Sequence, residues 1–193
     1  MHTWVGYDVD GRGDIFWSDS FSKRLEVKID QLILYNNAVE KLIKSCTEKE
    51  VKTELLRLKL IFKDALESNS VALKKFNKEG FVENFNAIKD VSNYLYKNKK
   101  KLLTNTNFIL KELDLLISKI IEKKKKVGQN TIEKLIILRI EIKNFGLGLG
   151  RTHLRLNANQ LNNAISKEID LSGDPNDPSN KRTYLSVVSK MID

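Results

Sequence analysis

The sequence has almost no cysteine, few histidines and no long apolar run. Its 193 residues include one cysteine, Cys46, so no disulfide can form within the chain. The two histidines and this cysteine do not have the spacing of zinc ligands. No apolar stretch approaches the ~20 residues of a membrane-spanning helix, and the first residues lack the apolar core of a secretion signal. We therefore expect a protein of the reducing cytoplasm that is neither secreted nor inserted in a membrane.

Charged residues are plentiful, and most of them are basic. Hydrophobic residues make up 41% and charged residues 31% of the chain, which fits one soluble domain or a piece of a larger one. The net charge of +9 raises the question of an acidic partner such as nucleic acid. However, the lysines alternate with acidic residues, the dense runs at 97–101 and 123–126 fall near expected helix ends, and no stacking aromatics are interleaved with them. We do not expect nucleic-acid binding, of which steep salt dependence would be the signature.

Apolar residues recur at helical spacing through most of the chain, which predicts a mainly α-helical protein. Asp19 or Ser20 would cap the first helix, and Thr47 with Glu50 would form a capping box at the second. A break is expected at Ser68–Ser70. The expected helices cover residues 19–46, 47–66, 81–95, 102–121 (the longest) and 130–144.

A short motif without helical spacing precedes these helices. Residues 1–18 would form a strand through Trp4 and then a turn made by Asp8, Asp10 and Gly11. The turn begins like a calcium loop, but its glycine stands at the fourth position rather than the sixth, so we do not expect calcium. Scaffolds often present side chains to a ligand at such places.

A second motif follows the helices and carries two arginines. Glycine alternates with leucine from Gly146 to Gly150, which predicts extended chain over 145–156. A dinucleotide fingerprint needs a strand before its glycines and a helix after them, whereas a helix precedes these, so we exclude that site. Arg151 and Arg155 would point the same way from the strand. They could pair with nearby carboxylates or bind an anionic substrate, and their spacing favours neither.

Together the two motifs resemble those of the phosphoenolpyruvate carboxylase family. The first motif matches the family pattern at Trp4, Val5, Gly6, Asp8, Asp10 and Gly11. The second matches at Phe145, Gly146, Leu149 and Arg155, with Leu154 as a conservative replacement. The order of the motifs and the long helical interval between them also agree. Seven positions depart from the pattern, as in a divergent member. Tyr7, Val9, Arg12 and His153 stand where the family has Gly, Arg, Asn and Asp, and Leu156, Asn157 and Ala158 stand where it has Gln, Glu and Ser.

The resemblance implies that residues 1–193 are one partial domain, with long helices and two short strands, a slice of the family's helix-enlarged (β/α)₈ barrel. Residues 157–193 would add helices and an Asp/Pro loop. The family is a cytoplasmic homotetramer that forms oxaloacetate and phosphate from phosphoenolpyruvate and bicarbonate with Mg²⁺ or Mn²⁺. Its catalytic histidine segment would precede Trp4 and its metal-binding carboxylates would follow Asp193. We therefore assign no catalytic residue and no metal ligand in this chain, and expect it to be inactive without the remaining parts of the carboxylase.

The resemblance also implies which residues bind substrate. Arg155 matches a family arginine that contacts the substrate phosphate, and we name Arg151 and Trp4 as further substrate-binding residues. The structural part of the motifs comprises Asp8, Asp10, Gly11, Phe145 and Gly146. Met1 lies three residues before Trp4, which suggests a truncated reading frame, and an incomplete barrel would leave apolar helix faces exposed. The alternative is a basic, non-catalytic helical interaction module in which the motifs persist as scaffold.

Overall fold

Five helices make up the described part of the chain. The computed structural model describes residues 17–122 and 129–148, all within the first of the two units into which the chain divides, Met1–Arg151. In chain order the helices are α1 (Trp17–Ser45), α2 (Lys49–Phe76), α3 (Phe85–Lys97), α4 (Asn107–Glu122) and α5 (Gln129–Phe145). The prediction of a mainly helical protein is thus confirmed over these ranges. None of the described helices is long and apolar enough to cross a bilayer.

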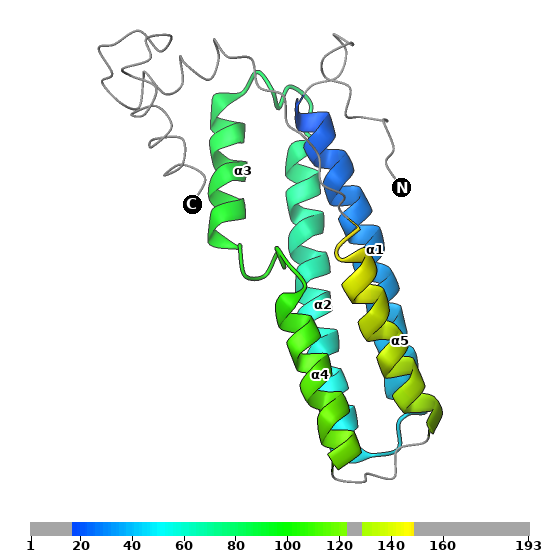
Figure 1. Ribbon diagram of the computed structural model, residues 1–193. Coiled ribbons are helices and arrows are strands. Elements are labelled where there is room, and N and C mark those ends of the chain that lie inside the picture. Colours follow the sequence, from blue (N-terminus) through cyan, green and yellow to red (C-terminus); the bar gives the residue numbers. More distant parts are fainter. Residues whose placement is uncertain (1–16, 123–128, 149–193) are drawn as a thin grey trace, which may run out of the picture. The chain divides into compact units, whose positions relative to one another are not determined.

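The helices α1 and α2 form a long antiparallel hairpin (Figure 1). The rings of Phe21 and Phe76 stack with their centroids 5.8 Å apart, and those of Tyr35 and Phe62 lie 5.9 Å apart further along the hairpin. Tyr35 lies fourteen residues after Phe21 in α1, and its ring partner Phe62 lies fourteen residues before Phe76 in α2. The two helices therefore keep one register over four turns.

The remaining helices pack on this hairpin. Both α3 and α4 contact α2, and α5 returns to contact α1 and α4 (Figure 1). A two-pronged ion pair joins α4 to α5, in which the Arg139 guanidinium donates to both carboxylate oxygens of Asp114, the Nη2 bond being 3.1 Å long. The described chain thus starts with α1 and returns with α5 to pack against it.

The buried side chains form two separate clusters. The aliphatic cluster lies where α1, α2, α4 and α5 meet, and its fully buried members include Leu32, Tyr35, Leu55, Phe62, Ile109, Leu113, Leu135, Leu138 and Ile142. The aromatic cluster lies where α1, α2 and α3 meet, and it consists of Phe76, Phe81 and Val91 with the partly buried Trp17, Leu25, Val82, Ala87, Ile88 and Leu95. Burial of this apolar area is the main free-energy gain on folding.

The second helix runs without the predicted break at Ser68–Ser70. Its cap is Glu48, whose carboxylate accepts from the Val51 N–H at 2.8 Å, one residue beyond the predicted Thr47. The break prediction was wrong because this polar stretch of α2 has hydrogen-bond partners elsewhere in the fold. The Ser68 carbonyl, for example, accepts a hydrogen bond of 3.1 Å from the Tyr94 hydroxyl of α3. Tertiary contacts of this kind override a weak local helix preference.

Other helix boundaries also differ from prediction. Helix α1 is already helical at Trp17, before Asp19, which lies in its first turn. Helix α3 begins after Asn84, whose side chain accepts from the Ala87 N–H, and so excludes the buried Phe81. Helix α4 has 16 residues against 29 in α1, so it is not the longest. It begins at Asn107 and does not include Leu103, whose φ of 55° is a left-handed conformation that a helix cannot contain.

The strand predicted over 145–156 is wrong where the chain is described. Phe145 is the last residue of α5, and Gly146 and Gly148 have φ values of 56° and 72°. A left-handed backbone is not extended; it ends a helix, and the Gly146 N–H donates to the Ile142 carbonyl at 3.0 Å. The glycines therefore serve as a helix stop rather than as a strand. Residues 149–156 and the other predicted strand, around Trp4, lie outside the described residues, so the likeness to a slice of a (β/α)₈ barrel is neither supported nor opposed there.

Candidate functional site

Most of the residues named from the sequence as site residues lie outside the described ranges. These are Trp4, Asp8, Asp10, Gly11, Arg151 and Arg155. The other two, Phe145 and Gly146, end α5, and the Phe145 ring is 64% exposed. The described start of the second motif is therefore a helix end with an exposed aromatic ring.

Tyr35 of α1 fastens this helix end. Its ring is buried in the aliphatic cluster, and its hydroxyl donates to the Gly146 carbonyl at 2.7 Å and lies 3.4 Å from the Glu141 carbonyl. Burial raises the pKa of Tyr35 to about 12, so the hydroxyl stays a neutral donor at every physiological pH. The hydrogen bond occupies a carbonyl that the end of α5 would otherwise leave without an intrahelical partner.

The chain leaving α5 also lies close against α1. The Gly148 N–H donates to the Phe145 carbonyl at 2.9 Å, which closes the turn. A Cβ added at Gly148 would come within 3.1 Å of Val27 Cγ1, 3.2 Å of the Val27 carbonyl oxygen and 3.3 Å of Gln31 Cβ. Glycine is required here both by the positive φ and by this approach. The structure thus holds the start of the second motif against the first half of α1.

A buried lysine was not predicted from the sequence, although the apolar pattern of α1 could have revealed it. Lys28 occupies the position of α1 that continues the apolar series of Leu25 and Leu32, and its side chain is only 6% exposed. No hydrogen bond or ion pair of its ammonium is found among the described residues, and burial lowers the pKa of Lys28 to about 8. A lysine at the core spacing of an amphipathic helix was the available signal.

Asn69 of α2 is a second buried polar residue in the same interface. It is 0% exposed, and its Nδ2 donates to the Ala65 carbonyl at 2.7 Å and to the Leu102 carbonyl at 3.0 Å. Its Oδ1 is buried and has no hydrogen-bond partner in the described structure. An orphaned acceptor of this kind is costly, and native structures contain few of them.

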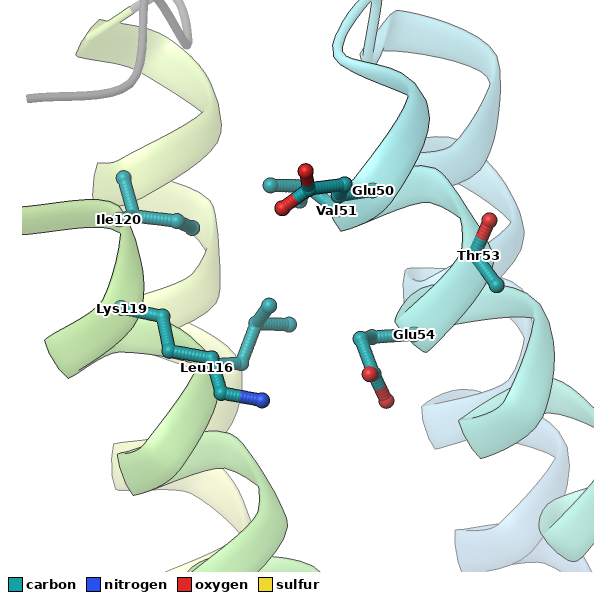
Figure 2. Close-up of a pocket in the computed structure, with 7 residues that line it drawn as sticks. All are labelled: Glu50, Val51, Thr53, Glu54, Leu116, Lys119 and Ile120. Atoms are coloured by element: carbon teal, nitrogen blue, oxygen red, sulfur yellow. The ribbon is translucent and has the colours of Figure 1, made fainter. Parts of the chain in front are cut away.

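A small hollow lies between α2 and α4 (Figure 2). It measures about 230 Å³, and Glu54 of α2 faces Lys119 of α4 across it. The charges around it are balanced: Arg57 Nη1 lies 3.8 Å from Glu54 Oε2 and 3.4 Å from Glu112 Oε2. We assign no ligand to this hollow.

The described part of the chain contains no cluster of side chains arranged as metal ligands. No group of three or more His, Cys, Asp or Glu side chains is placed there to hold a metal ion.

The described residues together define a class, an antiparallel bundle of helices in which Tyr35 of α1 is hydrogen-bonded to the chain that ends α5. In comparisons with protein-family models, curated proteins and solved structures, no match to the chain was found.

Proposed function

We propose that the chain is part of a phosphoenolpyruvate carboxylase, which forms oxaloacetate and phosphate from phosphoenolpyruvate and bicarbonate. The proposal rests on the two sequence motifs, around Trp4 and around Phe145. The observation that carries it furthest is the hydrogen bond from Tyr35 to Gly146. It joins the start of the second motif to α1, the helix that follows the first motif in the sequence.

Within this proposal, Arg155 neutralises the phosphate of the substrate, and Arg151 and Trp4 complete the contact. A forked guanidinium suits this task because it can donate two parallel hydrogen bonds to phosphate oxygens. The catalytic histidine and the metal-binding carboxylates come from the remaining parts of the carboxylase, so the chain is inactive alone and the metal is bound elsewhere.

The test is oxaloacetate formation from phosphoenolpyruvate, bicarbonate and Mg²⁺. The purified chain is assayed alone and mixed with the products of the flanking reading frames. We expect activity only in the mixture, and its loss in Arg155→Ala. Lys41→Met, which removes one exposed cation from α1, is the matched control and keeps the activity. Absence of activity in every mixture would reject the proposal.

A basic helical interaction module is the second candidate, and one observation favours it. Ile136, Ile137 and Ile140 lie on one face of α5, and each is more than a third exposed although isoleucine belongs to the most often buried residues. Neighbouring exposed isoleucines on one helix mark a surface that another protein covers. Under this proposal Ile140→Lys would abolish self-association or partner binding measured by light scattering, with Lys134→Ala as control. A monomer at all concentrations, with the same radius in wild type and variant, would count against it.

A further inference from the structure

Helix α5 carries a second apolar face, which lies opposite the face that it buries. Leu138 and Ile142 are buried, and Ile140 is two residues from each of them, which is about 200° around the helix. Ile136 and Ile137 are four and three residues from Ile140, so they lie beside it, and the three isoleucines are 39–54% exposed. Of the described helices, only α1 and α4 contact α5. A helix that is apolar on opposite faces is typical of one that is covered on both.

Charged residues stand at the two ends of this outer face. Four residues have the spacing of the core positions of a coiled coil, three, four and three residues apart: Glu133, Ile136, Ile140 and Lys143. All four are exposed. The outer face of α5 therefore has isoleucines in its middle, an acidic residue at its start and a basic residue at its end.

This arrangement is complementary to itself when two copies of α5 run antiparallel. If Ile136 of one copy lies opposite Ile140 of the other, Glu133 lies opposite Lys143, because each charged residue is three positions beyond its isoleucine. Two-fold symmetry then repeats both contacts at the other end of the pair. A parallel pair would instead place Glu133 against Glu133 and Lys143 against Lys143, and such like-charge contacts are unfavourable. The charges therefore favour the antiparallel pair.

We propose that the outer face of α5 binds a second copy of this chain, forming an antiparallel dimer with two-fold symmetry. Four layers make the contact: two pair Ile136 with Ile140, and two pair Glu133 with Lys143. Burial of the isoleucines drives the association, and the charge pairs set its direction. The proposal rests on the second candidate function, the helical interaction module, and names its partner. The contact spans only about three helical turns, so we expect a weak dimer that forms as the protein concentration rises.

The experiment is sedimentation velocity of the full chain over a wide range of protein concentration. Circular dichroism confirms that each variant is folded. We expect the wild type to pass from monomer to dimer, and Ile140→Lys to remain monomeric at concentrations where the wild type is dimeric. Leu60→Lys, which changes a 61% exposed apolar residue of α2 in the same way, is the matched control and keeps the dimer.

Charge reversals test the direction of the pair. Glu133→Lys and Lys143→Glu each place like charges in both end layers, and we expect either to raise the dissociation constant of the dimer at least about tenfold. The double variant exchanges the two charges and should restore the dimer, which a misfolded chain would not do. Lys134→Glu changes the net charge as Lys143→Glu does but lies outside the four layers, so it should leave the dimer intact.

The outcomes separate the dimer from the interaction module on which it rests. A dimer that Ile140→Lys abolishes but the charge reversals leave unchanged would overturn the antiparallel pairing and leave the module in place. Weakening by both single reversals without recovery in the double variant would overturn the pairing equally. A wild type that stays monomeric, or a dimer that survives Ile140→Lys, would overturn both. Oxaloacetate formation is measured separately, so none of these results depends on the carboxylase assignment.

Discussion

The aliphatic and aromatic clusters both lie on the long helices α1 and α2, but different helices cover them and they bury different numbers of residues. Nineteen buried residues form the aliphatic cluster, which α4 and α5 enclose on the sides that α1 and α2 leave open. Three buried residues form the aromatic cluster, where α3 is packed on α2 and most neighbours are only partly buried. Since hydrophobic stabilisation follows the apolar area removed from water, the aliphatic half holds most of the stability of the bundle. The aromatic half is the part that opens first.

The largest effect is expected from truncating the centre of the aliphatic cluster. Phe62→Ala removes a fully buried ring that contacts Tyr35, and we expect it to lower the free energy of unfolding by about 3–5 kcal/mol. Urea unfolding followed by circular dichroism measures the loss. Leu60→Ala, at a 61% exposed position of the same helix, is the control and should change stability by less than about 0.5 kcal/mol. Equal losses in the two variants would contradict the assignment of the core.

Lys28, buried on α1 between the two clusters, gives an effect of opposite sign. Lys28→Met replaces a buried cation with an apolar chain of similar length, and near neutral pH it should stabilise the fold by about 3 kcal/mol. The pKa of Lys28 is about 8 when folded and about 10.5 when unfolded, so the unfolded chain binds more protons between these values. Wild-type stability should therefore rise with pH from about 8 to 10.5. Urea titrations across this range measure the rise, and a wild-type slope that persists in Lys28→Met would show that another group causes it.

The aromatic cluster should respond locally to truncation. Phe81→Ala removes a ring that contacts Trp17 and Phe76, and we expect it to lower the opening free energy of α3 by about 2 kcal/mol, because the partly exposed neighbours can collapse into the space. Hydrogen exchange would then become roughly thirtyfold faster in α3, since each 1.4 kcal/mol is a factor of ten in an equilibrium constant. Exchange in α5 should hardly change. Uniform acceleration across all helices would remove the distinction between the two halves.

The smallest effect concerns the end of α5. Tyr35→Phe keeps the ring and removes the donor to the Gly146 carbonyl, which should cost about 1 kcal/mol. Amide exchange at Gly146 and Gly148 should accelerate more than exchange in the middle of α5. Tyr94→Phe, which removes the hydroxyl bonded to the Ser68 carbonyl, is a matched control on α3 and should leave these two glycines unaffected.

Helical periodicity predicted the five helices of the described ranges, because apolar residues at three- and four-residue spacing lie on one face of a helix. It did not predict the last part of α2, beyond Leu66. The boundaries were harder to predict. Thr47 and Glu48 are adjacent candidates for the cap of α2. Local sequence does not show the tertiary packing that selects Glu48. The uninterrupted course of α2 past Ser68 depends on Tyr94, 26 residues further along the chain, and local patterns do not contain such contacts.

The second motif shows how one pattern has two meanings. Glycine alternating with leucine after Gly146 fits a strand, but it also fits a helix stop in which Gly146 and Gly148 adopt positive φ. The deciding contact is the approach of Gly148 to Val27, more than a hundred residues away in sequence. Lys28 differs in this respect, because its place in the series of Leu25 and Leu32 was visible in the sequence. Its neighbour Asn69 could be placed opposite it only once the register of the hairpin was known.

The hydrogen bond from Tyr35 to Gly146 also bears on the order of folding. It joins residues 111 positions apart, and closing a flexible loop of that length costs about 4 kcal/mol of chain entropy in the length-dependent term alone. One hydrogen bond is worth about 1 kcal/mol, so it cannot close the loop unaided. We expect the α1–α2 hairpin, which needs only a short connection, to form in the transition state, and α5 to dock after it. Leu55→Ala in α2 should then slow folding, whereas Leu138→Ala in α5 should mainly accelerate unfolding. In kinetic terms, α5 is the helix that docks last among those described and undocks first.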